Sequence, residues 1–141
     1  MRISALCAAL AVTAVTFAGT VTPAAAEPSA STVTLDAGAG LHHSTGRVIY
    51  EHVDGAVNSV KIISVRATGG SADCAWVQWN DPKAGGDGWQ SLNSEPGCYG
   101  GTVGETLDVV IKAPAGHPLK VRLAAYHADS VDVMHKDIAK L

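Results

Sequence analysis

Aromatic and polar side chains gather in one stretch of the sequence, between Cys74 and Cys98. All three tryptophans lie there, although aromatic residues make up only 5% of the chain. Trp79 stands at the predicted end of a strand and Trp89 follows a run of glycines, so we expect both rings to be exposed. Exposed indoles can stack on sugar rings while nearby polar groups bind hydroxyls. The predicted ligand-binding residues are Trp79, Asn80, Asp87, Trp89, Gln90 and Tyr99.

A purely structural interpretation of these rings competes with the binding hypothesis. Trp79 and Trp89 could pair across a hairpin and only cover the sheet. Trp76 shares a strand face with Cys74, and a large ring packed on a disulfide commonly fills the interior of a sandwich. We therefore expect Trp76 to be a core residue and not a ligand contact.

The cysteines indicate a disulfide. Cys7 lies in the N-terminal apolar run, which leaves Cys74 and Cys98 as an even pair. In an exported protein such a pair is expected to be oxidised, and closing this loop stabilises by about 3.5 kcal/mol on the chain-entropy model. A two-thiolate metal site is the alternative, but it lacks the C-x-x-C spacing that zinc sites usually have.

Six histidines raise the question of a metal centre. No H-x-H, H-E-x-x-H or C-x-x-C motif occurs, and most of these histidines are expected to be exposed loop residues. We therefore predict no metal and no cofactor. If folding did gather imidazoles, the first ligands to test would be His42 and His43 with His127 or His135.

Catalytic motifs are absent from the sequence, and no catalytic residue is assigned. No serine lies in a G-x-S-x-G motif, and the proximity of His127, Asp129 and Ser130 in sequence does not make a triad. The glycine-rich segment from Lys83 to Gly88 lacks the Gly-Lys-Ser/Thr ending of a phosphate-binding loop. An enzyme is thus less favoured than a binding protein.

Residues 1–26 have the pattern of a secretory signal peptide. Arg2 precedes an apolar run from Ile3 to Ala18, and Pro23–Ala26 ends in small residues suited to cleavage. A membrane anchor is the alternative, but the run is short for a span of about 20 residues and no basic cluster follows it. We therefore expect a secreted chain, not inserted in the membrane after cleavage, in which residues 27–141 form one domain.

The charge balance narrows the choice of partners. The chain has 10 Lys and Arg against 13 Asp and Glu, a formal net charge of −3, and no basic cluster. Nucleic acids and anionic membranes are therefore poor partners, which leaves an extracellular glycan or protein. The Ala- and Gly-rich composition resembles that of small exported domains of high-GC bacteria.

Seven segments have the alternation or the β-branched content of strands. They are residues 32–35, 47–53, 57–67, 74–80, 89–92, 106–112 and 119–126. Turn signals between them predict a mainly β fold, an antiparallel β-sandwich or small barrel of about seven strands. Leu107, Val109 and Ile111 are expected to face the core, while the slipped alternation at Ile62–Ile63 indicates a bulge or a strand covered on both faces.

The C-terminal segment fits two structures. Val131, Met134, Ile138 and Leu141 recur at helical spacing, with lysines toward the end, which favours a short helix. The alternation of Val131 and Val133 would suit a strand instead.

Three functions follow from these features. The favoured one is a non-catalytic module that binds a carbohydrate or cell-wall polymer through the aromatic hairpin. The second is an inhibitor or interaction protein that presents the disulfide-braced loop from Pro82 to Pro96 to an extracellular enzyme. The third is a small secreted hydrolase or histidine-dependent metalloprotein.

Overall fold

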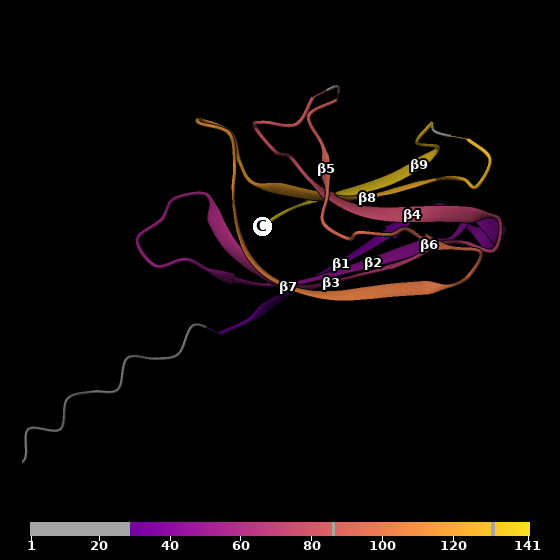
Figure 1. The fold of residues 1–141 in the computed structure, drawn as a ribbon, viewed down its shortest axis with the longest axis horizontal. Coiled ribbons are helices and arrows are strands. Elements are labelled where there is room, and N and C mark those ends of the chain that lie inside the picture. The colour runs from indigo at the N-terminus through magenta and orange to yellow at the C-terminus, as the bar shows by residue number, and fades with distance from the viewer. Residues whose placement is uncertain (1–28, 86, 131) are drawn as a thin grey trace, which may run out of the picture.

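Two antiparallel sheets stack face to face (Figure 1). The computed structural model describes residues 29–85, 87–130 and 132–141, so the predicted signal peptide lies outside the described residues. The first sheet has the order β1-β2-β3-β7, with strands β1 (Ser31–Ala37), β2 (Ser44–His52), β3 (Ser59–Thr68) and β7 (Thr102–Lys112). This arrangement confirms the predicted β-sandwich.

The second sheet has the order β5-β4-β8-β9, with β6 also paired to β4. Its strands are β4 (Asp73–Trp79), β5 (Gln90–Ser91), β6 (Gly97–Cys98), β8 (Lys120–His127) and β9 (His135–Lys140). A 3-10 turn, η1 (Gly40–His42), connects β1 to β2. The seven predicted strands are all present among the described residues. Of the other two, β6 had no strand pattern in the sequence, and β9 falls in the segment where a short helix was favoured over a strand.

The core lies between the sheets and is built from one face of each strand. In β8 the alternate residues Val121, Leu123 and Ala125 are fully buried, as their spacing predicts. Across the interface they meet residues of β1 and β2 such as Leu35 and Val48. Alternation in sequence therefore identifies most of the apolar face on each strand.

A bulge in the first sheet accounts for the slipped alternation of β3. Ile49 pairs with Ser64 and Tyr50 with Ile62, which leaves Ile63 as an extra residue. The inward face thus passes from Ile62 to Val65, and both are buried. The expectation of a bulge at Ile62–Ile63 is confirmed.

The expectation that Val109 is a core residue is wrong. Leu107 and Ile111 pack on the core, but Val109 is 41% exposed. It lies on β7, the edge strand of the first sheet, just after Asp108, whose φ of 53° breaks the regular strand. An edge position has a neighbour on one side only, so less of the side chain is covered.

The C-terminal segment is a strand, so the predicted short helix is wrong. β9 pairs antiparallel with β8 along its whole length, from His135–Ala125 to Lys140–Lys120. Met134 and Ile138 remain 50% and 45% exposed, and Val131 lies outside the described residues. A helix here would have left the edge of β8 unpaired, and pairing that edge satisfies its backbone groups.

The two faces of β4 are the reverse of what the tryptophans indicated. Ala75 and Val77 belong to the core, and Trp79 packs partly against it. Trp76 is half-buried on the opposite, outer face, so the expectation that it fills the core is wrong.

The expected disulfide is present. Cys74 and Cys98 are bonded, with their Cα atoms 4.0 Å apart, and they are cross-strand partners in β4 and β6. The bond ties the end of the long loop after β4 back to that strand. In the described part of the chain, no helix is long and apolar enough to cross a bilayer.

Candidate functional site

Five of the six residues predicted to bind ligand gather near the C-terminal end of β4, and the sixth, Tyr99, lies at the other end. Trp79 and Asn80 are at the C-terminal end of β4, at the open end of the sandwich. Asp87 and Trp89 belong to the loop before β5, and Gln90 opens β5 as the partner of Trp79. Trp79 and Trp89 are both half-buried, so the expectation that both rings are exposed is wrong. Tyr99, 68% exposed, follows β6 and lies beside Asp73 at the other end of β4.

Tyr99 and Trp79 therefore do not line one groove. A strand rises about 3.3 Å per residue, so the two ends of the seven-residue β4 are about 20 Å apart. The loop between β4 and β6 returns to both ends of this strand, because Gln90 pairs with Trp79 and Cys98 pairs with Cys74. The sequence alone does not show that Trp79 and Tyr99 lie at opposite ends of β4, because the pairing of β5 and β6 with β4 decides their positions.

Two hollows flank Pro82 at the open end of the sandwich. One, of about 380 Å³, lies between Trp79 and the end of β7 at Ile111. The other, of about 340 Å³, lies between Asn80 and His117. The Asn80 side chain bridges two segments here, donating to the Pro118 carbonyl at 2.9 Å and accepting from the Lys120 N–H at 2.7 Å.

Arg122 anchors the loop that carries Trp89. Its guanidinium lies 4.4 Å from the centre of the Trp89 ring, within cation–π range. It also donates to Gln78 Oε1 at 2.8 Å and to Asp87 Oδ2 at 2.6 Å. Although Arg122 points away from the core, these contacts bury it to 7% exposure.

The two charged groups of this ion pair, Asp87 and Arg122, differ in exposure. The hydrogen bond from Arg122 lowers the pKa of Asp87 below its ordinary value, against the opposing effect of burial. The side chain of Asp87 is 60% exposed whereas that of Arg122 is 8% exposed. The exposed carboxylate of Asp87 therefore pairs with the guanidinium of Arg122, which is itself buried beneath Trp89.

Trp76 and Tyr126 extend this outer face of the second sheet. The Trp76 Nε1–H donates to the Tyr126 hydroxyl at 2.7 Å. Between the strands, Trp76 is the cross-strand partner of Ala124, which is 1% exposed although it lies outside the core cluster. Side chains on this face thus cover the sheet beneath them.

These contacts define an aromatic face, made up of Trp76, Trp89 and Tyr126 on the outer side of the second sheet. Strand residues two apart on one face lie about 7 Å apart, so Trp76 and the Gln78–Arg122 pair beneath Trp89 are neighbours. Sequence reasoning missed Trp76 and Tyr126 as surface residues. Alternation alone separates the faces of a strand but does not say which face is inside.

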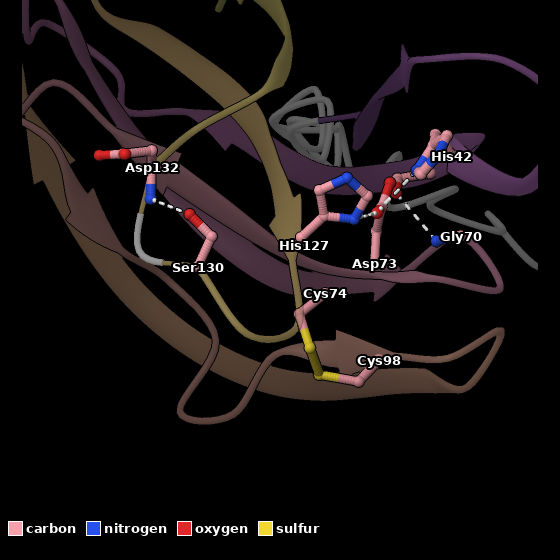
Figure 2. A network of polar contacts seen from close by, with 9 residues as sticks. His42, Gly70, Asp73, Cys74, Cys98, His127, Ser130 and Asp132 are labelled. Atoms are coloured by element: carbon pink, nitrogen blue, oxygen red, sulfur yellow. Dashed lines mark hydrogen bonds and ion pairs between the residues drawn. A yellow bond between two sulfur atoms is a disulfide. The ribbon is translucent and has the colours of Figure 1, made fainter.

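A second cluster of polar side chains lies at the opposite end of β4, around Asp73 (Figure 2). Asp73 opens β4 and is only 1% exposed. Its Oδ1 lies 2.9 Å from Nδ1 of His42 and 3.2 Å from Nδ1 of His127. The imidazoles meet edge to face, with ring centres 4.8 Å apart.

The backbone brings these three residues together from distant parts of the chain. Asp73 and His127 are cross-strand partners in β4 and β8. His42 ends η1, which packs on the turn before β4 through the Ala72 N–H donating to the Leu41 carbonyl. A Cβ at Gly70 would lie 2.5 Å from that carbonyl oxygen, so glycine permits the approach.

Of the histidines singled out in the sequence, two enter this cluster. His127 and His42 contact Asp73, and His135 lies 5.9 Å from His42 between ring centres. His43 points elsewhere, with its Nε2 2.7 Å from Asp36 Oδ1. Asp73 itself carried no signal in the sequence, because only the pairing of β4 with β8 brings it to His127.

Comparison of the chain with protein-family models, with curated proteins and with solved structures finds no match.

Proposed function

We propose that this protein is a secreted, non-catalytic binding module that recognises an extracellular carbohydrate, with a cell-wall polymer favoured, through the aromatic face. The observation that carries the proposal is the alignment of Trp76, Trp89 and Tyr126 on one outer sheet face. Aromatic rings on a rigid sheet offer flat apolar surface at low entropic cost.

The rings are held before any ligand arrives. Tyr126 accepts a hydrogen bond from Trp76, and Arg122 packs on Trp89 while it is itself fixed by Gln78 and Asp87. Fewer side chains then have to be immobilised on binding, which favours affinity. Polar groups at the border, such as Gln90 and Asp87, are exposed and available to sugar hydroxyls.

The test is a binding titration monitored by tryptophan fluorescence. The probes are soluble cello-, chito- and xylo-oligosaccharides, together with sedimentation on insoluble peptidoglycan. We expect binding by at least one probe that weakens tenfold or more in Trp89→Ala and Trp76→Ala, since a stacked ring contributes at least about 1.4 kcal/mol.

Val57→Ala is the control, because Val57 is an apolar residue, 80% exposed, in the connection between β2 and β3 of the first sheet and not on the aromatic face. Its binding should equal that of the unaltered protein. Flat titrations with every glycan, or equal losses in all three variants, would contradict the proposal.

A second candidate is an inhibitor that presents the loop from Pro82 to Pro96. The observation in its favour is the anchoring of this loop, in which Asn93 Oδ1 accepts from the Val77 N–H at 2.8 Å and Glu105 accepts from the Ser94 N–H and hydroxyl. Pre-organised loops lose little entropy on binding. Capture of one extracellular enzyme by the protein, abolished in Asp87→Ala and Arg122→Ala, would support this candidate over the glycan-binding one.

A further inference from the structure

We propose that His42, Asp73 and His127 form a binding site for a divalent transition-metal ion, with zinc as the preferred ion. The ligand atoms would be Nδ1 of each imidazole and a carboxylate oxygen of Asp73. No sequence motif indicates such a site, which lies where Asp73 opens β4 and His127 ends β8, directly after Tyr126.

The spacing of the ligand atoms carries the first part of the proposal. In a tetrahedral zinc site, bonds of about 2.0–2.1 Å place neighbouring ligand atoms about 3.3 Å apart. Oδ1 of Asp73 lies 2.9 Å and 3.2 Å from the two Nδ1 atoms. Ligand atoms from all three residues lie within 4.8 Å of one another, so a small shift of the rings would admit an ion.

The buried carboxylate carries the second part. Asp73 is 1% exposed, and its Oδ2 has no hydrogen-bond partner among the described residues. A buried carboxylate oxygen without a partner is costly, because it has lost water and gained nothing. A divalent cation beside this carboxylate would supply the missing partner charge.

The chemistry of the ligand set selects the ion. Two imidazole nitrogens and one carboxylate oxygen suit zinc, and copper as a competitor, better than calcium or magnesium, which prefer all-oxygen sites. On binding, each neutral ring would carry its proton on Nε2, so that the Nδ1 lone pair is free to coordinate. Both imidazoles are about one-third exposed, which leaves a path for the ion and a position for water.

The position in the fold indicates what the ion would do. His42 comes from the connection between β1 and β2 of the first sheet, whereas Asp73 and His127 belong to the second. The ion would therefore join the two sheets at the end next to the Cys74–Cys98 disulfide (Figure 2). Because it would bind only the folded chain, it should raise the unfolding temperature.

The experiment is a calorimetric titration of the chelator-treated protein with Zn²⁺, followed by thermal unfolding with and without the ion. We expect one ion per chain and a higher unfolding temperature. In His42→Ala and His127→Ala the affinity should fall at least tenfold and the thermal shift should disappear. Both side chains are partly exposed, so these variants are expected to fold, whereas Asp73→Asn alters a buried group.

His117→Ala is the matched control, because His117 is an exposed histidine in the loop before β8, away from the cluster. It should bind Zn²⁺ as the unaltered protein does. A direct readout of the ligands is the Cu²⁺ electron paramagnetic resonance spectrum, which should show coupling to two nitrogens and lose one in each single variant. No binding by the unaltered protein, or equal binding in His42→Ala and His127→Ala, would overturn the proposal.

Discussion

At the scale of single residues, Arg122 shows how a charged side chain on the outer face of a sheet can be buried by polar and aromatic contacts. Its guanidinium is covered by Trp89 and satisfied by Gln78 and Asp87. The hydrophobic body of the arginine lies along the sheet while its charge is paired at the end. Removing one partner would leave part of the buried positive charge of Arg122 unpaired. The stability of this cluster should therefore depend on whether Asp87 is ionised.

The ionisation of Asp87 predicts a pH dependence of stability. Because Arg122 lowers the pKa of Asp87 in the folded protein, the stabilisation is complete above the unfolded pKa of about 3.9 and is lost as the pH falls through the folded value. Asp87→Asn should therefore lower the free energy of unfolding at pH 7 and pH 5, with a smaller difference at pH 3. Since the carboxylate is exposed and screened, we expect about 0.5 kcal/mol at pH 7.

Urea unfolding at the three pH values measures this effect. Arg122→Gln provides the reference background, in which Asp87→Asn should cause a smaller pH-dependent change, because only backbone hydrogen bonds to Asp87 remain. An equal difference at pH 7 and pH 3 in the unaltered background would contradict the assignment.

Residue types also limited what the sequence could reveal about the two sites. Asp87 and Trp89 are predicted ligand contacts because an indole and a carboxylate in a glycine-rich loop suit a polar ligand, and that assignment stays a prediction. Trp76 was misassigned, since its proximity to Cys74 indicated burial, yet the disulfide itself lies outside the core cluster. Asp73 was missed because its partner His127 is brought to it only by strand pairing.

At the scale of elements, the seven strands with alternating or β-branched residues were predictable, whereas the pairing of an edge strand was not. Alternation identified β8 because its inward residues are all apolar, and it located the bulge in β3. It failed for β9, whose apolar residues fit a helix equally well. What decides β9 is the open edge of β8, a long-range hydrogen-bonding demand that local pattern does not contain.

The irregularity in β7 gives a prediction for this element. Between the pairs Ile62–Val109 and Ser64–Thr106, two residues of β7 oppose Ile63 alone. One of them, Asp108, has a φ of 53°, in the left-handed region that β-branched residues avoid. We expect Asp108→Val to lower the free energy of unfolding by about 1–2 kcal/mol.

Asp108→Gly should cost much less, because glycine adopts this conformation freely. Both variants lose the exposed Lys61–Asp108 ion pair, in which the Asp108 side chain is 71% exposed, so the pair cancels in the comparison. Urea unfolding of the two proteins gives the difference. A valine variant as stable as the glycine variant would show that the bulge relaxes when the residue changes.

At the scale of the whole molecule, the fold depends on how closely the two sheets can approach. Stacked sheets usually pack about 10 Å apart, with side chains from both filling the space. Here Gly46 of β2 faces the second sheet, where an added Cβ would lie 3.0 Å from Leu123 Cδ1 and 3.3 Å from Val77 Cγ2. The absence of a side chain at this position therefore lets the large Leu123 of the opposite sheet seat fully.

Gly46→Ala should consequently destabilise the protein by about 1–3 kcal/mol, because interiors at native density accommodate an extra methyl group only by moving neighbours. Leu123→Ala alone should cost about 3–5 kcal/mol through the cavity it leaves. If the two side chains compete for one space, the double variant should be more stable than the sum of the single effects allows. Gly104→Ala on β7 is the matched control, since its Cβ would meet only Arg66 Nε at 3.6 Å and Val65 O at 3.8 Å.

Thermal and urea unfolding of these four variants measure the coupling directly. Strictly additive losses for Gly46→Ala and Leu123→Ala would mean that the sheets separate to admit the methyl group, and the tight approach at Gly46 would then not limit the packing. A favourable coupling of about 1 kcal/mol or more is expected instead, because the cavity left at Leu123 is adjacent to the new methyl group. The glycine within β2 is then explained by the packing of the opposite sheet, a relation between residues 77 positions apart in the sequence.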